Sequence, residues 1–209
     1  MTQSTLALIV FLFPLAYSPG PGNLFFAANG ARFGLRATVP ANMGYHLATL
    51  LVTLAIGLGF SAIAAQGGAM ARAMVWAGSA YMLYLAARLL RAGVSQHEIQ
   101  PRPAGFADGA VLMILNPKAH VIILLMFSQF LPLGGAEGAG RILPVLWIAG
   151  VFTLNNLLAF VIWTLAGDRL AARFRDRAGA RRLNAILGLM LAGVALWMLA
   201  GMLAGMLAR

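Results

Sequence analysis

The 209-residue chain is 61% hydrophobic and only 10% charged, and it carries a formal net charge of +10. Because an ordinary soluble domain has about 25% charged residues, this composition excludes a soluble domain and a disordered chain. The chain has no Cys, so a disulfide scaffold, a redox centre and a thiolate metal site are excluded as well. We therefore expect one all-α integral membrane domain over residues 1–209, in contact with membrane lipids and without a metal or cofactor.

A membrane-spanning helix needs about 20 mostly apolar residues. Six such stretches occur, at roughly 5–29, 38–63, 69–90, 109–132, 142–166 and 184–207. Arg residues concentrate in the loops after the first, third and fifth stretches, which indicates orientation signals facing anionic lipid rather than a nucleic-acid surface. These loops, including 91–108, should be cytoplasmic, with both termini outside. The basic segment 168–182 is either a short hairpin or an amphipathic helix on the inner leaflet.

A cluster of helix breakers lies inside the first stretch, at Ser18-Pro19-Gly20-Pro21-Gly22-Asn23. Each Pro removes a backbone donor and blocks the carbonyl one turn earlier, so the helix should kink or unwind here and free backbone carbonyls. Irregular backbone at membrane depth is tolerated where it is buried in protein or lines a cavity. The candidate binding residues are therefore Pro19, Gly20, Pro21, Gly22 and Asn23; a plain packing kink is the alternative.

A second cluster, Asn116-Pro117-Lys118, lies in the fourth stretch and is followed by His120. Lys118 stands about ten residues into the stretch, near the middle of the hydrocarbon core. A charged Lys facing lipid there would cost about 3 kcal/mol, so its ammonium should face the protein interior. A break at Pro117 would let Asn116 and Lys118 face one cavity. Lys118 would then bind a ligand carboxylate or, alternatively, the carbonyls freed in the first helix.

A third signal is a polar stripe in the second stretch. Asn42, His46, Thr49 and Thr53 share one helix face because they are spaced by four, three and four residues. The stripe indicates either a polar pathway or hydrogen bonds to neighbouring helices. Asn155 and Asn156 lie at similar depth in the fifth stretch. Acidic residues are absent at this depth, so the candidates for moving protons are His46, His120 and Lys118.

The chain divides into two halves of three helices, about 1–90 and 106–209. Each half begins with a Pro-broken helix, and each has a Pro near the start of its second helix, at Pro40 and Pro144. An odd number of spans per half implies two inverted repeats, and interrupted helices at matching positions indicate the binding site. Gly201 and Gly205 in the last stretch permit a close helix contact, either within the monomer or in a homodimer.

These residues, in this order, resemble the LysE/RhtB family of bacterial amino-acid exporters over nearly the whole chain. The matching features are the motif from Ser18 to Asn23, then Asn29, Phe33-Gly34, Arg36, Pro40, Gly44, the stretch from Gly78 to Leu85, Asn116-Pro117-Lys118 and Phe130-Leu131-Pro132. The resemblance implies gradient-driven export of amino acids or similar small metabolites across the bacterial cytoplasmic membrane. One departure is Gly22, which stands where members usually place Asp or Asn. The motif therefore has no carboxylate, which argues against a cationic substrate such as lysine.

Charge complementarity then suggests roles within an exporter. The freed carbonyls and Asn23 would bind the substrate ammonium, Lys118 and Asn116 would bind its carboxylate, and the path would be lined by Asn42, His46 and Asn155 or Asn156. An intramembrane enzyme is an alternative, with Ser18 or Ser128 as nucleophile and His46 or His120 as base, but neither serine lies in a Gly-x-Ser-x-Gly context. An exporter of metal ions is a further alternative, which the lack of Cys and of buried acids disfavours.

Overall fold

The structure is a computed structural model that describes residues 2–59, 102–131 and 139–171 continuously, with separate positions between 76 and 90 and between 182 and 204. Within these residues every regular element is a helix and none is a strand. The all-α prediction is therefore confirmed for this part of the chain. Parts of the third and sixth predicted spans, Gly201, Gly205 and residues 172–181 lie outside the described residues.

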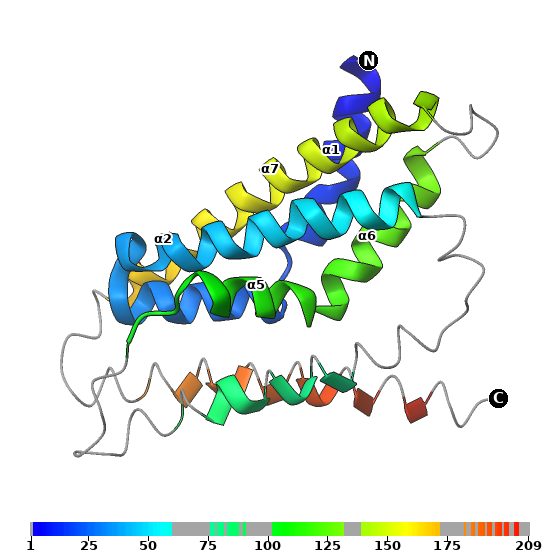
Figure 1. Cartoon of the computed structure of the whole chain (residues 1–209). Helices are drawn as coiled ribbons and strands as arrows, with labels where there is room; N and C mark the ends of the chain where they lie inside the picture. The colour runs from blue at the N-terminus through cyan, green and yellow to red at the C-terminus, as the bar shows by residue number, and fades with distance from the viewer. Residues whose placement is uncertain are drawn as a thin grey trace.

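The first two predicted spans correspond to α1 (Thr2–Tyr17) and α2 (Pro21–Leu58). The first span is broken at residues 18–20, as predicted. The first span was expected to end near residue 29, and the helix continues until Gly34, which lies inside the predicted loop between the first two spans. Gly34 has φ 79° and ψ 171°, a conformation that glycine adopts without the steric cost of a Cβ. The chain reverses there, so the two parts of α2 lie side by side (Figure 1).

The fourth predicted span is also broken, into α5 (Phe106–Ile114) and α6 (Pro117–Phe130), which are bent by 60° relative to each other. Pro117 is the first residue of α6, a position where its missing N–H and fixed φ are compatible with a helix. The fifth predicted span is α7 (Ala139–Ala171), which is several residues longer than expected at both ends. By length and composition, Pro21–Leu58 and Gly140–Ala171 are apolar enough to cross a membrane, and α5 and α6 are so as one bent unit.

Glycines allow α2 to approach its neighbours at backbone distance. A Cβ at Gly44 would overlap the Phe106 carbonyl of α5, and a Cβ at Gly109 of α5 would overlap a backbone carbonyl of α2. The same relation joins α2 and α7, where Gly30 and Gly167 each face a carbonyl of the other helix. In a membrane, where helices gain little from hydrophobic burial against one another, such close contacts stabilise packing.

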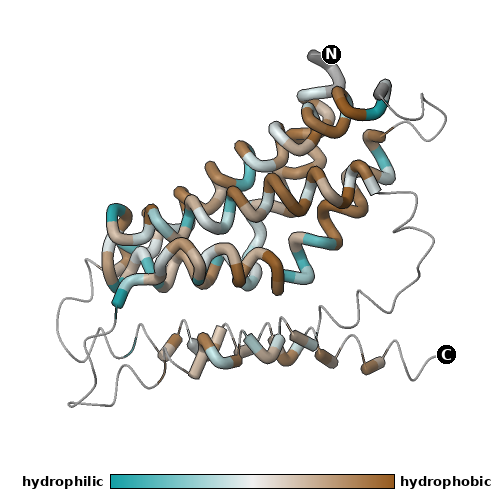
Figure 2. Tube along the Cα trace, in the orientation of Figure 1, coloured by the Kyte–Doolittle hydropathy of each residue, from teal (hydrophilic) through white to brown (hydrophobic). Residues whose placement is uncertain are grey.

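The helix faces have the polarity expected of a membrane protein. On the second part of α2 the polar stripe is buried, with Asn42 5% exposed, whereas Met43, Leu47 and Leu51 on other faces are 48–62% exposed. Figure 2 shows hydrophobic colouring along most of the helix lengths and hydrophilic colouring at the end where α2 bends. Large apolar side chains therefore face outward along the described helices, where lipid would solvate them.

Basic residues from three predicted loops meet at that end. Arg32 and Arg102 line one cavity there. The last turn of α7, which carries Arg169, comes close to the bend, because a Cβ at Gly34 would lie 3.9 Å from Asp168 Oδ1. Arg141 stands 28 residues before Arg169 on α7, or about 42 Å away at 1.5 Å per residue. The described parts of the first, third and fifth loops thus lie at one end of the bundle.

Candidate functional site

The break between α1 and α2 exposes three consecutive backbone carbonyls, and a side chain donates a hydrogen bond to each. The pairs are Asn23 Nδ2 to Ala16 O at 2.9 Å, Trp163 Nε1 to Tyr17 O at 3.1 Å and Lys118 Nζ to Ser18 O at 2.8 Å. These carbonyls form the C-terminal end of α1, where the helix dipole favours positive charge. The predicted freeing of carbonyls is confirmed, and in this arrangement they are satisfied by donors of the protein itself.

Lys118 connects the two broken helices. Its ammonium also donates to Ser18 Oγ at 3.0 Å, and the two residues are 100 positions apart in the sequence. Two partners were expected for the Lys118 ammonium, a ligand carboxylate or a carbonyl of the first helix. In the structure the ammonium donates to the carbonyl. Lys118 is half-buried, and none of the described acidic side chains forms an ion pair with it. Among the described residues, the Lys118 ammonium therefore has uncharged hydrogen-bond acceptors and no carboxylate as counter-charge.

The break between α5 and α6 is closed largely by local bonds. The Asn116 carbonyl accepts from the amides of Ala119 at 3.1 Å and His120 at 3.4 Å, and from His120 Nδ1 at 2.9 Å. The Asn116 side chain instead reaches the other half of the chain, where its Nδ2 donates to Tyr45 Oη at 2.8 Å. Its Oδ1 is buried without a hydrogen-bond partner in the structure. The break thus presents one unpaired acceptor beside Lys118.

Three helix ends converge at this point. The C-terminal end of α1 and the N-terminal ends of α2 and α6 meet around Lys118, because a Cβ at Gly20 would lie 2.9 Å from Lys118 Nζ. A cavity of about 10 Å³ is lined there by Asn23, Asn116, Lys118 and Asn156, among others. That volume holds about one water molecule. The structure therefore brings these four predicted residues together around a small cavity.

Aromatic rings wall this cavity. Tyr45 and Phe160 both line it, and their ring centroids are 4.6 Å apart. Phe160 also lies 5.0 Å from the ring of Phe26. A Cβ at Gly22 would approach Phe160 Cζ to 2.6 Å, so Gly22 provides the space that the ring occupies. Pro19 and Pro21 act through the backbone, since they bound the break, and Pro21 is the first residue of α2.

The rings of Tyr45 and Phe160 and the indole of Trp163 were not recognised from the sequence. Tyr45 follows Asn42 by three residues, and Phe160 follows Asn156 by four. Helical periodicity places each on the face of a predicted polar residue, so that signal could have identified two of them. Nothing in the sequence pattern links Trp163 to the first break.

The polar stripe of α2 is buried as predicted, but its bonds are mostly internal. Thr49 and Thr53 donate to carbonyls four residues earlier in α2, at 2.8 Å and 2.6 Å, so for these two hydroxyls the structure shows bonds within the helix and not the interhelical bonds of the alternative interpretation. His46 Nδ1 donates to the Asn42 carbonyl at 2.9 Å, since a carbonyl can only accept. His46 Nε2 is then an acceptor in the neutral ring, and Asn156 Nδ2 lies 3.4 Å from it.

Two predicted asparagines remain incompletely paired. Asn42 Oδ1 and Asn155 Nδ2 are buried without hydrogen-bond partners. Neither residue lines the cavity beside Lys118. Buried polar atoms without partners are rare in native structures and call for a partner that the static arrangement does not supply. Their role in a pathway stays a prediction.

The enzyme alternative finds no matching geometry in the described residues. Ser18 Oγ donates to the Leu15 carbonyl and Ser128 Oγ to the Leu125 carbonyl, and neither bonds to a histidine. The ring of His120 is bound through Nδ1 to the Asn116 carbonyl. In the described part of the chain, no three residues of the His, Cys, Asp and Glu types cluster as metal ligands would.

Comparison with known proteins decides the family. The model of the LysE type translocator family matches residues 13–201. The chain belongs to this family. It is 30% identical over 181 residues to the cysteine/O-acetylserine efflux proteins of Salmonella paratyphi A and Salmonella typhi, and 29% identical to that of Escherichia coli strain K12. Each alignment covers 84% of this chain and 87% of the relative. No solved structure matches the chain.

The family and the fold together set the protein's class. The chain is a membrane protein of a translocator family and is helical in its described residues, and the relatives named here are efflux transporters, not enzymes. The resemblance inferred from the two Pro-containing motifs is therefore confirmed at the level of the family.

Proposed function

We propose that this protein exports amino acids or related small zwitterionic metabolites from the cytoplasm, through a site between its two broken helices. The observation that carries the proposal is the contact of Lys118 Nζ with the Ser18 carbonyl and hydroxyl, at 2.8 Å and 3.0 Å. It joins the two breaks at a half-buried position where opposite ends of half-helices meet. The relatives named as cysteine/O-acetylserine efflux proteins favour zwitterions of about the size of cysteine as substrates.

The carboxylate end of the substrate binds at the start of α6. Helix N-termini attract anions because the helix dipole is positive there. In α6 the amides of Ala119 and His120 already donate to the Asn116 carbonyl, so the attraction comes from the dipole and from Lys118. Lys118 is the second residue of α6, so its ammonium adds a full charge at the same place. No described acidic side chain pairs with it, and a substrate carboxylate supplies the missing counter-charge.

The ammonium end of the substrate binds at the end of α1. The Ser18 carbonyl now accepts from Lys118, and the substrate ammonium takes over this acceptor when Lys118 turns to the carboxylate. Asn23 stands beside it with its Nδ2 on the Ala16 carbonyl. The exchange keeps every charged group paired, which matters because an unpaired buried charge is costly.

Transport requires the site to open, since a cavity of about 10 Å³ cannot hold an amino acid. In our proposal six helices form two inverted three-helix repeats in the bacterial inner membrane, and the repeats move against each other around the site. The Arg-rich end of the bundle is cytoplasmic and both termini are outside. A proton or ion gradient drives export, with His46, His120 and Lys118 as the proton-coupling residues.

The test uses the purified full chain in liposomes loaded with a panel of labelled amino acids that includes cysteine and O-acetylserine. Release is recorded with and without an imposed pH gradient. Lys118→Met removes the charge but keeps the length of the side chain. Because loss of one partner of a buried charged contact costs about 3–5 kcal/mol, we expect release to fall by at least about 100-fold.

Arg36→Gln is the matched control, because it also removes one positive charge but from an exposed side chain outside the site. It should release the substrate at the wild-type rate. Wild-type rates in Lys118→Met would overturn the role of Lys118. If folded wild-type protein released none of the panel, the amino-acid exporter proposal would fail. Release that does not respond to the pH gradient would remove the proton-coupling roles alone.

A further inference from the structure

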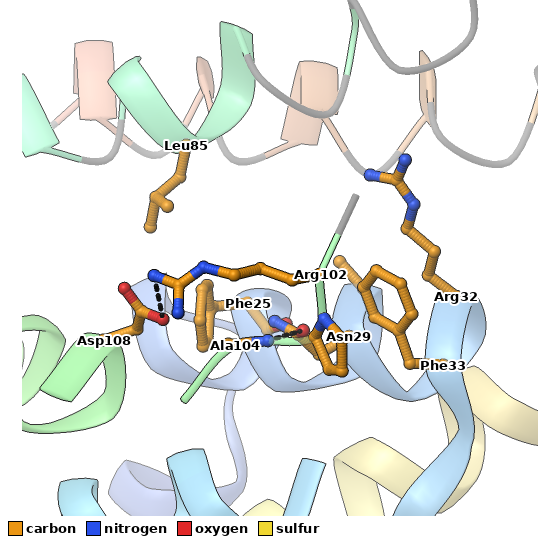
Figure 3. Close-up of a pocket in the computed structure, with 10 residues that line it drawn as sticks. Phe25, Asn29, Arg32, Phe33, Leu85, Arg102, Ala104 and Asp108 are labelled. Atoms are coloured by element: carbon orange, nitrogen blue, oxygen red, sulfur yellow. Dashed lines mark hydrogen bonds and ion pairs between the residues drawn. The ribbon is translucent and has the colours of Figure 1, made fainter. Parts of the chain in front are cut away.

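A second cavity lies at the Arg-rich end of the bundle, about 70 Å³ in volume and therefore larger than the one beside Lys118. Three segments that are far apart in the sequence form it. The first part of α2 contributes Asn29 and Arg32. A second segment contributes Arg102, just before α5, and Asp108, in the first turn of α5. Leu85 covers the cavity from a third segment (Figure 3). It thus has two cations, one anion and an apolar cover.

The polar groups of this cavity are held in place. Asn29 Oδ1 accepts from the Ala104 amide at 3.2 Å, which fixes the chain before α5 against α2. Asp108 Oδ2 accepts from the Gly105 amide at 2.8 Å and lies 3.6 Å from a guanidinium nitrogen of Arg102. The Arg102 side chain is 74% exposed, so this ion pair is weak. A guanidinium has five donors, and Arg102 can bind an incoming carboxylate while staying near Asp108.

Aromatic rings separate this cavity from the site beside Lys118. Phe25 lines the larger cavity, and its ring packs edge-on against Phe26 at 5.3 Å. The ring of Phe26 in turn lies 5.7 Å from Tyr45 and 5.0 Å from Phe160, which wall the smaller cavity. A continuous series of packed rings therefore runs from Phe25 at the larger cavity, through Phe26, to the aromatic wall of the smaller cavity.

We infer that the cavity at Arg102 and Asp108 is a loading site, where a zwitterionic substrate binds before it passes Phe25 and Phe26. The guanidinium of Arg102 binds its carboxylate, Asp108 binds its ammonium, and Arg32 adds positive charge at the edge of the cavity. This deepens the proposed function and rests on it, because the loading site is useful to an exporter only if this end faces the cytoplasm. An anionic lipid headgroup offers the same anionic oxygens, and the experiment distinguishes the two sources.

The experiment measures initial rates of substrate uptake into inverted membrane vesicles, which present the cytoplasmic end to the medium. Arg102→Gln should raise KM about threefold to fivefold, as expected for losing an ion pair at an exposed position. The maximal rate should stay within about twofold of wild type, because the later transport steps are untouched. Arg32→Gln should raise KM in the same direction, and Arg102→Lys, which keeps the charge but not the planar fork, should be intermediate.

Arg36→Gln is the control on the same bend, since Arg36 is exposed and does not line the cavity. If KM is unchanged in both Arg102→Gln and Arg32→Gln, the loading site is overturned. If transport is still lost in Lys118→Met, the exporter proposal is unaffected by that result. A lower maximal rate with unchanged KM would show that Arg102 is merely structural.

The lipid arm repeats the measurement after reconstitution in phosphatidylcholine alone and with added phosphatidylglycerol. A KM shift in both lipids supports a substrate site. A shift that appears only with phosphatidylglycerol would assign the cavity to a lipid phosphate and overturn the proposal. Absence of uptake by wild-type vesicles would instead count against the exporter itself.

Discussion

The break between α1 and α2 draws two of its three side-chain donors from distant parts of the chain, whereas the break between α5 and α6 is closed mainly by residues within one turn. The first break depends on Lys118 and Trp163, which are 100 and 146 residues from their acceptors. At the second break the Asn116 carbonyl is satisfied by Ala119 and His120. Both breaks contain proline, so proline alone does not explain the difference.

The difference shows how one site can be both stable and responsive. Donors from other helices can leave the first break when those helices move, and its carbonyls then become available to a substrate. The second break keeps its backbone bonds during such a movement and can carry Lys118 as a rigid unit. Substitutions that disturb the first break should therefore affect transport more than substitutions at the second.

The largest effect after loss of Lys118 is expected for Gly22→Ala, just after the first break. The new methyl would lie 2.6 Å from Phe160 Cζ and 3.3 Å from Tyr45 Oη. Overpacking of this kind costs about 1–3 kcal/mol and would drive the ring into the cavity. We expect efflux to fall at least about tenfold, measured as release from loaded liposomes at equal protein content.

Phe160→Leu should restore part of the efflux in the Gly22→Ala background, because the shorter side chain leaves room for the methyl. Ala at position 150 provides a control, since a Cβ at Gly150 on α7 meets nothing within 4 Å. Equal loss in Gly150→Ala would show that the helices respond to any added methyl and would remove the argument from Phe160.

A smaller effect is expected for Tyr45→Phe, which removes the tether between the second break and α2. Asn116 Nδ2 then loses its acceptor at 2.8 Å, while the backbone bonds of the break remain. Leaving a buried donor unpaired costs about 1–3 kcal/mol, part of which a water in the cavity can offset. We expect efflux to fall about fivefold, with a lower thermal unfolding midpoint. A loss as large as that of Lys118→Met would contradict the view that the second break is self-sufficient.

The sequence was sufficient to predict the elements that local chemistry controls. The two breaks follow from the backbone geometry of Pro19, Pro21 and Pro117, and the bend follows from a glycine. The bend was expected in the loop that contains Asn29-Gly30 and Gly34, and it lies at Gly34. The helix passes through Gly30, because an isolated Gly can remain helical when packing requires it. Gly30 does so, since it faces a carbonyl of α7.

The candidate site was predicted less completely, because its contacts join separate helices. Four predicted polar residues meet as expected, because polar groups at membrane depth face the protein interior or a water-filled cavity. They are Asn23, Asn116, Lys118 and Asn156. The sequence did not show whether the Lys118 ammonium binds a backbone carbonyl or a ligand carboxylate, because either group can accept its hydrogen bonds. The cavity at Arg102 forms where three separate segments of the chain pack together. Helical periodicity does not predict which segments pack against one another.

The smallest effect is expected for Thr53→Val, on the same face of α2 as Tyr45 but away from both breaks. Thr53 Oγ1 donates to the Thr49 carbonyl within its own helix, and that carbonyl already belongs to the helical backbone. Val has nearly the same shape, and hydrogen bonds between groups in membrane helices contribute on average only about 0.6 kcal/mol. Efflux should therefore stay within about twofold to threefold of wild type, measured in the same liposomes. A larger loss, with unchanged thermal stability, would mean that the hydroxyl serves the substrate path and that the site extends along the stripe beyond the two breaks.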